Sequence, residues 1–299
     1  MTARASPADH QLATSDNRIE ASSAAPGTGA SAVPPMEVAI RTSGLTRRFG
    51  DLVAVDRLDL RVRAGSIYGL LGPNGAGKST TIKILITLLP PSEGTAEVAG
   101  LDVVREARAV RHHIGYVSQL LSADGGLTGY ENLMLSACLY GIPRRERRAR
   151  IDEALATMEL SDAAHRVVST YSGGMVRRLE IAQATIHHPA VLILDEPTIG
   201  LDPIARRAVW EQMRQARRAG KTTILLTTHD MEEADALCDE VGLITHGRLA
   251  AHGTPAALKQ TIGPTASLDD VFTRYGDPRD EGGSYRDIRG TRRTAERLG

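Results

Sequence analysis

The sequence predicts an α/β fold, built on a buried sheet whose strands end in polar, chemically active residues. Three observations lead to this prediction. A short apolar strand at residues 66–71 runs into a glycine-rich loop, and a helix leaves that loop. A second apolar strand, 189–194, ends in two acids, and a third, 222–228, ends in a histidine. Functional side chains of α/β proteins gather at the carboxyl ends of such strands.

The glycine-rich loop fits the Walker A pattern G-x-x-x-x-G-K-[S/T], which wraps backbone around the phosphates of a nucleotide. Its glycines let successive N–H groups turn inward, and the following helix, expected at 80–89 and stopped by Pro90 and Pro91, adds its positive end. Lys78 is expected to reach the β- and γ-phosphates and Ser79 to bind Mg²⁺. A glycine-rich turn with a capping serine would leave Lys78 unexplained. This phosphate loop comprises Gly72, Pro73, Asn74, Gly75, Ala76, Gly77, Lys78, Ser79 and Thr80.

Composition predicts a chain that is globular over most of its 299 residues, of which 41% are hydrophobic. Lys+Arg and Asp+Glu balance at 36 each and only 3% of residues are aromatic, so nucleic acid is not an expected partner. Cys138 and Cys238 lack metal-like spacing and are expected to be reduced packing residues. No apolar run approaches the ~18 residues that cross a bilayer, so any membrane role is expected to come through a partner chain.

The two ends of the chain differ in composition from its middle. Residues 1–35 are rich in Ala, Ser, Thr, Pro and Gly without periodicity, which predicts a disordered arm; a targeting or partner-binding role is the alternative. From Val38 an alternation of apolar and polar residues predicts a small antiparallel β layer. There Phe49, beside a turn, could stack on a base or close the edge of the layer, and both remain open. The final segment, 259–299, is expected to be an extension that ends in a disordered, charged tail after about Gly276.

The stretch from Leu127 to about Arg166 predicts a mostly helical insert. Its basic run, 144–150, opens a helix after Pro143 and contains a glutamate, which favours a solvated helix face over a nucleic-acid site. Just before the insert, Gln119 lies where a strand meets a loop; it either caps that loop or reaches an ion or water at the site, and the strand end favours the site. The expected apolar face consists of Leu133, Leu135, Leu139, Ile151, Leu155 and Met158.

Four further motifs follow this stretch. Ser172-Gly173-Gly174, here called the signature segment, opens a helix and in isolation is an ordinary cap. Asp195 and Glu196 end a buried strand, where phosphoryl-transfer sites hold Mg²⁺. Asp202 lies in the next turn and His229 ends the next strand.

In this order the motifs resemble the nucleotide-binding subunits of ATP-binding cassette (ABC) transporters, over roughly residues 37–258. The resemblance implies a P-loop NTPase core with a mixed central sheet, an antiparallel β subdomain and an inserted helical subdomain at about 123–185, within an ATPase domain of residues 36–258. The match around Ser172 and Asp202, together with residues 267–272, is most similar to the ATPase subunits of daunorubicin-type drug-resistance exporters.

The resemblance also implies roles for the strand-end residues. Asp195 would hold Mg²⁺ through water, Glu196 would polarise the attacking water, and His229 would contact the γ-phosphate. Gln119 would sense that phosphate and would signal to the transport partner. It is also a further candidate for binding the metal. Phe49 would stack on adenine, where the family more often has tyrosine.

Two motifs are implied to act between chains. The signature segment would bind ATP across a dimer interface, with Asp202 at that interface, so that one site needs two chains, most simply two copies of this one. This chain has Ile199 where the family more often has threonine, and no chemistry is assigned to that position.

The expected function is therefore an ATPase, using ATP and Mg²⁺, that drives a separate permease from the cytoplasmic face of the cell membrane. Drug or antibiotic efflux is the expected task, with lipid or polysaccharide export as the alternative. A non-transport cassette ATPase usually has two cassettes or long coiled-coil arms, and neither is seen here. A catalytically dead subunit would be expected to lack Glu196 or His229, and both are present.

Overall fold

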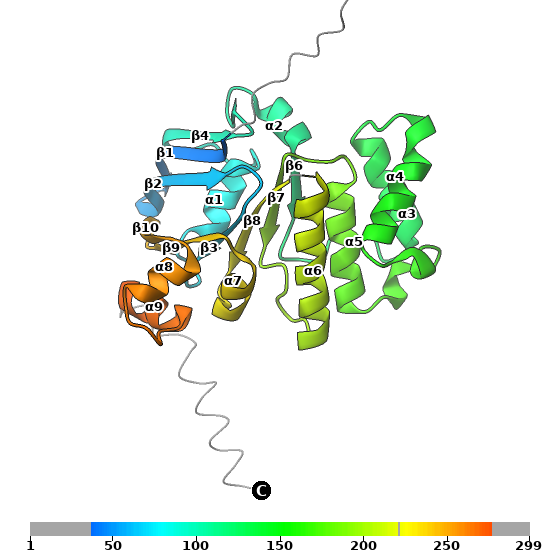
Figure 1. Cartoon of the computed structure of the whole chain (residues 1–299). Coiled ribbons are helices and arrows are strands. Elements are labelled where there is room, and N and C mark those ends of the chain that lie inside the picture. The colour runs from blue at the N-terminus through cyan, green and yellow to red at the C-terminus, as the bar shows by residue number, and fades with distance from the viewer. Residues whose placement is uncertain (1–36, 221, 277–299) are drawn as a thin grey trace, which may run out of the picture. The chain divides into compact units, whose positions relative to one another are not determined.

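The computed structural model describes residues 37–220 and 222–276. The expected disordered arm at 1–35 and the tail after about Gly276 lie outside the described residues. Within them, Figure 1 shows two sheets with helices between and around them, and a helical region on the side of the central sheet away from the first β layer. The predicted fold class is confirmed, whereas the domain boundaries stay predictions.

An antiparallel sheet of four strands forms the predicted β layer. Burial alternates strictly from Arg57 to Arg63 because one face of this sheet meets the core and the other meets solvent. The strand order is β2-β1-β4-β5. The bounds are β1 Val38–Phe49, β2 Leu52–Arg63, β4 Glu93–Val98 and β5 Leu101–Asp102.

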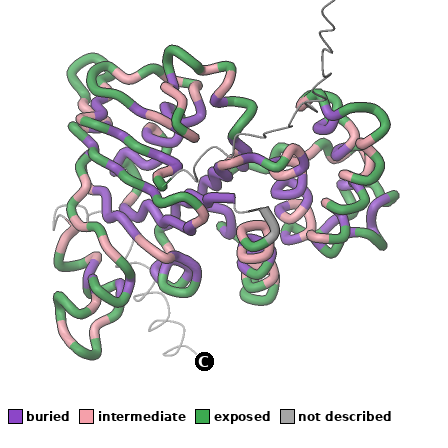
Figure 2. Tube along the Cα trace, turned by 45° about the horizontal axis from the view of Figure 1, so that its top comes forward, coloured by how far each residue is buried: buried purple, intermediate pink, exposed green. Residues whose placement is uncertain are grey.

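A second sheet of six strands, ordered β10-β9-β3-β8-β7-β6, forms the mixed central sheet. All its pairings are parallel except the antiparallel pair β9–β10. Every residue of β3, β7 and β8 is buried, and the buried stretches in Figure 2 follow these strands. The bounds are β3 Ile67–Leu71, β6 Ile114–Val117, β7 Val191–Asp195, β8 Thr223–Thr228, β9 Glu240–Thr245 and β10 Arg248–Gly253.

Helices cover both faces of the central sheet, as alternate residues of β7 show. Leu192 and Leu194 pack in a core with α5, α6 and α7, whereas Val191 and Ile193 pack in a core with α1 and the β layer. Burial on both faces explains why these strands read as continuous apolar runs. Besides α3 and α4, described below, the α-helices of the described residues are α1 Lys78–Leu85, α2 Ala107–His113, α5 Gly173–Thr185, α6 Pro203–Gly220, α7 Met231–Leu237, α8 Pro255–Gln260 and α9 Leu268–Tyr275.

The helical insert is present between β6 and β7. It contains α3 (Gly129–Leu139), which begins with a capping box between Thr128 and Glu131, and α4 (Arg144–Thr157), which follows Pro143. The short 3-10 helices η1 (Ser161–Ala163) and η2 (Val168–Thr170) complete it.

Three details of the prediction were wrong. Leu135 and Leu139 are exposed, because α3 buries the stripe that contains Leu133 and Ala137 instead. Cys138 is also exposed, whereas Cys238 is buried as predicted. Helix α1 ends at Leu85, before the prolines, because Thr87 adopts a left-handed conformation (φ 65°). The N–H groups of Leu88 and Leu89 then both bond to the carbonyl of Lys83, which closes the helix.

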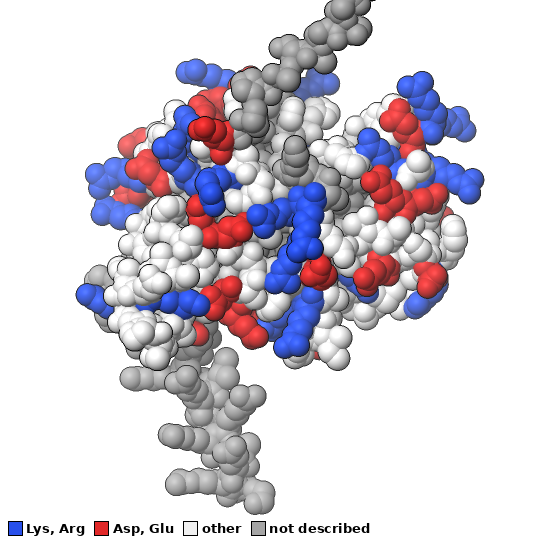
Figure 3. All heavy atoms as spheres, viewed as in Figure 1, with Lys and Arg blue, Asp and Glu red and all other residues white. Residues whose placement is uncertain are grey.

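Charged side chains of both signs are interspersed on the face shown in Figure 3, with arginines of α6 along its centre. The basic run at the start of α4 lies on an exposed helix surface, as predicted. No helix within the described ranges has the length and apolar character needed to span a bilayer.

Candidate functional site

The phosphate loop connects β3 to α1 and leaves the start of that helix open. Gly77 occupies the N-cap position, and no side chain accepts a hydrogen bond from the first turn. Its φ of 107° and the carbonyl oxygen of Ala54, 2.5 Å from where a Cβ would lie, restrict this position to glycine. Uncapped N–H groups at a helix N-terminus form a ready site for an anion such as phosphate.

The ammonium group of Lys78 lies over this loop. Lys78 is only 5% exposed, and its Nζ donates hydrogen bonds to the carbonyl oxygens of Gly72 (2.6 Å) and Pro73 (3.1 Å). Burial lowers the pKa of Lys78, and the nearby carboxylates of Glu196 and Asp195 act in the opposite direction. A cation in this position can exchange its carbonyl partners for phosphate oxygens.

Two adjacent acids end β7, and a threonine of the next strand holds both. Thr227 Oγ1 donates to Asp195 Oδ1 (2.6 Å), while the backbone N–H of Glu196 donates to the carbonyl oxygen and to Oγ1 of Thr227, each at 3.1 Å. Glu196 has a positive φ of 48°, a conformation that costs about 1–3 kcal/mol in a non-glycine residue. These contacts turn the strand sharply at the acids. Sequence analysis missed Thr227, which a polar residue in a fully buried strand could have signalled.

The carboxylate of Glu196 lies between the ammonium group of Lys78 and the imidazole ring of His229. Glu196 Oε1 is 4.0 Å from Lys78 Nζ, and Oε2 is 3.1 Å from His229 Nδ1. The hydrogen bond with His229 lowers the pKa of Glu196 against the effect of burial, and the same bond raises the pKa of His229. Glu196 is thus held ionised near neutral pH, as a base that activates water must be.

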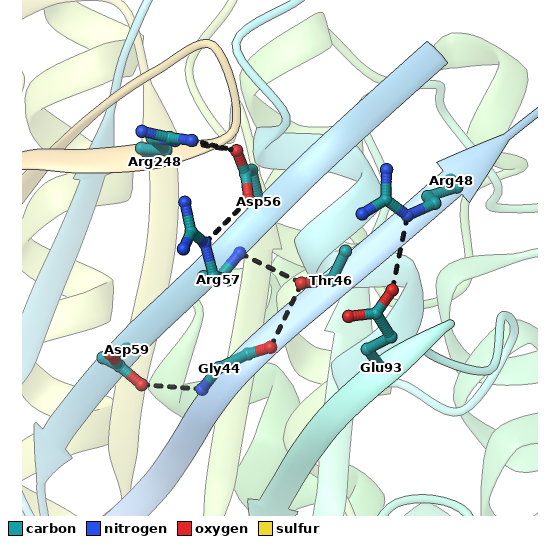
Figure 4. Close-up of polar contacts among 8 residues, drawn as sticks. All are labelled: Gly44, Thr46, Arg48, Asp56, Arg57, Asp59, Glu93 and Arg248. Atoms are coloured by element: carbon teal, nitrogen blue, oxygen red, sulfur yellow. Dashed lines mark hydrogen bonds and ion pairs between the residues drawn. The ribbon is translucent and has the colours of Figure 1, made fainter. Parts of the chain in front are cut away.

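A turn between β9 and β10 ties the phosphate loop to the β layer. The N–H of Gly247 donates to the carbonyl oxygen of Ala76, and the N–H of Asp56 donates to the carbonyl oxygen of Gly247, both at 2.9 Å. Figure 4 shows Arg248 reaching the Asp56 carboxylate, with Nε 2.8 Å from Oδ2. The sequence carried no signal for this link beyond an isolated glycine.

Phe49 lies at the far end of β1 and is 45% exposed, with the guanidinium of Arg47 4.8 Å from its ring centroid. Its cross-strand neighbour Leu52 is exposed as well. An exposed aromatic ring that attracts a planar cation can also stack on a purine.

The signature segment and Asp202 form a second group. Ser172 caps α5 by accepting from the N–H of Met175 (3.3 Å), and Asp202 Oδ1 accepts from the N–H groups of Ile204 and Ala205 (2.9 Å each) at the start of α6. Gly174 packs against α6, where a Cβ would lie 2.8 Å from that of Ala205. Ser172 and Gly173 themselves are exposed.

Gln119 lies in an exposed loop after β6, here called the Gln119 loop (residues 118–123). The described contacts attach its backbone to α5, since Arg177 donates to its carbonyl oxygen (3.1 Å). The predicted residues therefore fall into two groups: one at the phosphate loop with Lys78 and Glu196, and one on α5 and α6 to which the Gln119 loop is joined.

Sequence analysis missed the buried carboxyl group of Glu233, which connects the turn after Glu196 to helix α6. Glu233 Oε1 accepts from Thr198 Oγ1 (2.7 Å), two residues after Glu196, and from Trp210 Nε1 (3.0 Å). Burial raises the pKa of Glu233. It holds α7, which follows His229, against α6 and the turn after β7.

Comparison with known proteins adds four similarities. Residues 55–199 match the family described as ABC transporter. The daunorubicin/doxorubicin resistance ATP-binding protein DrrA of Streptomyces peucetius is 50% identical over 225 residues, 75% of this chain and 68% of that protein. The Nod factor export ATP-binding protein I of Sinorhizobium fredii is 44% identical over 244 residues, 82% and 70% respectively. A solved ATP binding subunit of an ABC transporter has a TM-score of 0.71 at 30% identity, covering 79% of this chain and 98% of that one.

Proposed function

Because this chain belongs to the ABC transporter family, as an ATP-hydrolysing subunit related to daunorubicin resistance ATP-binding proteins, we propose that it powers drug export through a separate membrane permease. The observation that carries this proposal is the convergence of Lys78, Glu196 and His229 beside an open phosphate loop. The permease would hold the chain at the cytoplasmic face of the membrane.

The contacts within the site support the following roles for its side chains. The phosphate loop and Lys78 bind the β- and γ-phosphates, and Phe49 stacks on adenine. Glu196, kept ionised by His229, accepts a proton from the water that attacks the γ-phosphate. His229 is placed to donate a hydrogen bond to the γ-phosphate as charge develops on it.

Mg²⁺ prefers oxygen ligands and retains several waters. The phosphate loop and the end of β7 each offer such a donor, in Ser79 and Asp195, and Gln119 would join them from the loop that is attached to α5. Ser79, Asp195 and Gln119 are the residues that would hold the ion. Within the described residues no cluster of three His, Cys, Asp or Glu side chains forms a metal site of its own. The nucleotide's phosphates would supply the remaining ligands, and the ion would neutralise charge on the transferred phosphoryl group.

Two copies of the chain complete each site in this proposal. Ser172 and Gly173 are exposed at the start of α5, in a group of contacts separate from the phosphate loop of the same chain. An exposed helix N-terminus with a serine hydroxyl can bind the γ-phosphate presented by a second copy. Asp202, exposed beside it, would lie at the interface.

The cargo is proposed from the relatives' names. The name of the Streptomyces peucetius relative refers to daunorubicin and doxorubicin resistance, which supports drug or antibiotic efflux. The name of the Sinorhizobium fredii relative refers to Nod factor export and keeps export of a lipid or polysaccharide as the second candidate.

Replacing Glu196 by Gln tests the catalytic proposal. The variant keeps the size and hydrogen-bonding reach of the side chain but removes the base, so ATP turnover should fall by about 10²–10⁴-fold while ATP still binds. Unhydrolysed ATP should then hold two chains together by mass action, and ADP should not. Light scattering with Mg·ATP or Mg·ADP measures the mass of the particle.

The matched control is Glu153→Gln, which removes an exposed acid from α4. It should retain turnover and remain monomeric during hydrolysis. Near-normal turnover of Glu196→Gln would remove Glu196 from the catalytic role. A monomer at saturating ATP would contradict the shared site.

A further inference from the structure

An ion pair between Arg177 and Glu180 lies buried in α5, one turn after the signature segment. The two residues are 2% and 3% exposed, and Arg177 Nη1 is 3.0 Å from Glu180 Oε2. Burial lowers the pKa of Arg177, and the carboxylate of Glu180 opposes that effect. Burying two charges costs free energy unless each group makes further hydrogen bonds. The other contacts of Arg177 and Glu180 therefore indicate what the pair does.

Those remaining contacts all go to the Gln119 loop. Arg177 donates from Nη1 to the carbonyl oxygen of Ser118 (2.7 Å) and from Nη2 to that of Gln119 (3.1 Å). At the other end of the loop, Glu180 Oε1 accepts from the N–H and the hydroxyl of Ser122 and from the N–H of Ala123. The cation thus binds the carbonyls where the loop begins, and the anion binds the N–H groups where it ends.

The middle of the loop has a different character. Leu120 and Leu121, between the two anchored ends, are 81% and 58% exposed. The Gln119 loop is therefore held firmly at its base on α5 and presents its apex outward. A bidentate arginine is suited to this task because its fixed fork of donors sets both distance and angle.

We propose that Arg177 and Glu180 are positioning residues, which fix the Gln119 loop to the helix that begins with the signature segment. The backbone of Gln119 is then held at a fixed place on α5, so that its side chain extends from a rigid base. This inference rests on the proposed function, because it assigns Gln119 and Ser172 to the nucleotide site. The alternative is that the ion pair has a purely structural role and only stabilises the helical insert.

The main test is the double variant Arg177→Met/Glu180→Leu, which removes both charges together and leaves neither buried without a partner. Amide hydrogen exchange at Ser122 and Ala123 should accelerate, because their acceptor is lost. The kcat for ATP should fall about 10–100-fold, as expected when a catalytic group is displaced by about 1 Å. The KM should change less than threefold, since the phosphate loop is untouched.

The control is Arg178→Met, the neighbouring arginine on the same helix. Arg178 donates to the carbonyl oxygen of Met158 (3.0 Å) and pairs with Glu159, so it ties α5 to the end of α4 and not to the Gln119 loop. It should leave exchange at Ser122 and Ala123 unchanged and kcat within about twofold of wild type.

A double-mutant cycle separates positioning from general stabilisation. If the pair acts through Gln119, the fold-loss in kcat caused by Arg177→Met/Glu180→Leu should largely disappear when both changes are introduced into Gln119→Ala. Effects that multiply independently would overturn the proposal, as would unchanged amide exchange or unchanged kcat in the paired variant. A wild-type protein that hydrolyses no ATP would contradict the proposed function and not the positioning role of Arg177 and Glu180.

Discussion

At the scale of single residues, the site combines groups that are unfavourable alone and stabilising together. Lys78 and Glu196 are both buried, and Glu196 also has a left-handed backbone. Thr227 holds that backbone by accepting its N–H, and His229 stabilises the carboxylate. The ionised carboxylate, which we propose to be the base, is therefore prepared before any nucleotide binds, which would avoid reorganisation during the reaction.

The pair between Glu196 and His229 should make folding stability depend on pH in a defined window. The pKa of His229 is raised above 6.5, so its contribution is fully present below pH 6.5 and is lost as pH rises through the raised value. The pKa of Glu196 is lowered below 4.5, so its contribution is present above pH 4.5 and is lost as pH falls through the lowered value. The pair is strongest between those limits.

We expect His229→Ala to lower the free energy of unfolding most at about pH 5.5 and least above about pH 8.5. His229 is 46% exposed, so solvent should keep the difference below about 1 kcal/mol. Urea denaturation of both proteins at the two pH values measures it, and His112→Ala, at an exposed position on α2, is the control. A difference that is equal or larger at high pH would contradict the assigned pair.

At the scale of elements, the turn between β9 and β10 joins parts that are far apart in the chain. Gly247 takes a φ of 75°, and a Cβ there would lie 2.8 Å from Val55 Cα and 2.9 Å from the carbonyl oxygen of Ala54. The turn can approach β2 and bond to Ala76 only because this residue has no side chain. The phosphate loop and the strand pair that ends in Phe49 are thereby held in a fixed relation.

Gly247→Ala should weaken both the fold and nucleotide binding. A left-handed alanine costs about 1–2 kcal/mol, and overpacking against β2 adds about 1–3 kcal/mol. For a protein of this size each kcal/mol lowers Tm by about 2–4 °C. Calorimetry and an equilibrium ATP titration measure the two effects.

Gly141→Ala provides the matched comparison. Its φ of 70° is similar, but nothing lies within 4 Å of the added Cβ. This variant should show only the backbone cost and keep wild-type ATP affinity. Equal loss of Tm in the two variants would refute a role for close packing at the turn.

At the scale of the whole molecule, nucleotide binding comes from local geometry and not from net charge. The formal charge of the chain is zero, and both signs are interspersed on the face in Figure 3. Such a chain has no strong long-range field to concentrate ATP. The binding free energy must then come from the phosphate loop, and it should appear as added stability of the entire fold.

Saturating Mg·ATP, at about 100 times its Kd, should stabilise the wild-type protein by about 2.7 kcal/mol and raise Tm by about 5–10 °C. Lys78→Ala removes a charge-assisted contact of about 1.5–3 kcal/mol and should lose most of that shift. Its Tm without nucleotide is the baseline for this comparison, because removing Lys78 relieves the desolvation of a buried cation but also takes a cation away from the buried carboxylate of Glu196.

The control is Lys83→Ala, an exposed lysine on the same helix, which should keep the full shift. Thermal scans with and without Mg·ATP report both quantities. A wild-type shift in Lys78→Ala would exclude this lysine from phosphate binding.

The sequence by itself determined the α/β class, the order of motifs and the strand ends at which they lie. These features depend on short-range rules: apolar runs predict buried strands, and the phosphate loop is a contiguous pattern whose chemistry resides in its own backbone and in Lys78. The same local character identified Ser172 as a helix cap. It also misled where helical phase mattered, since Leu135 and Leu139 lie only one or two residues from the buried stripe of α3.

Only the tertiary structure decided which side chains support the site. Thr227 bonds to Asp195 across 32 residues and Arg177 to Ser118 across 59, contacts set by strand order and helix packing that no local pattern encodes. The link from Gly247 to Ala76 depends in the same way on β9 pairing beside β3. Motif residues can be found from sequence because their neighbours along the chain define them. Their partners cannot, because burial and pairing bring them together only in the folded protein.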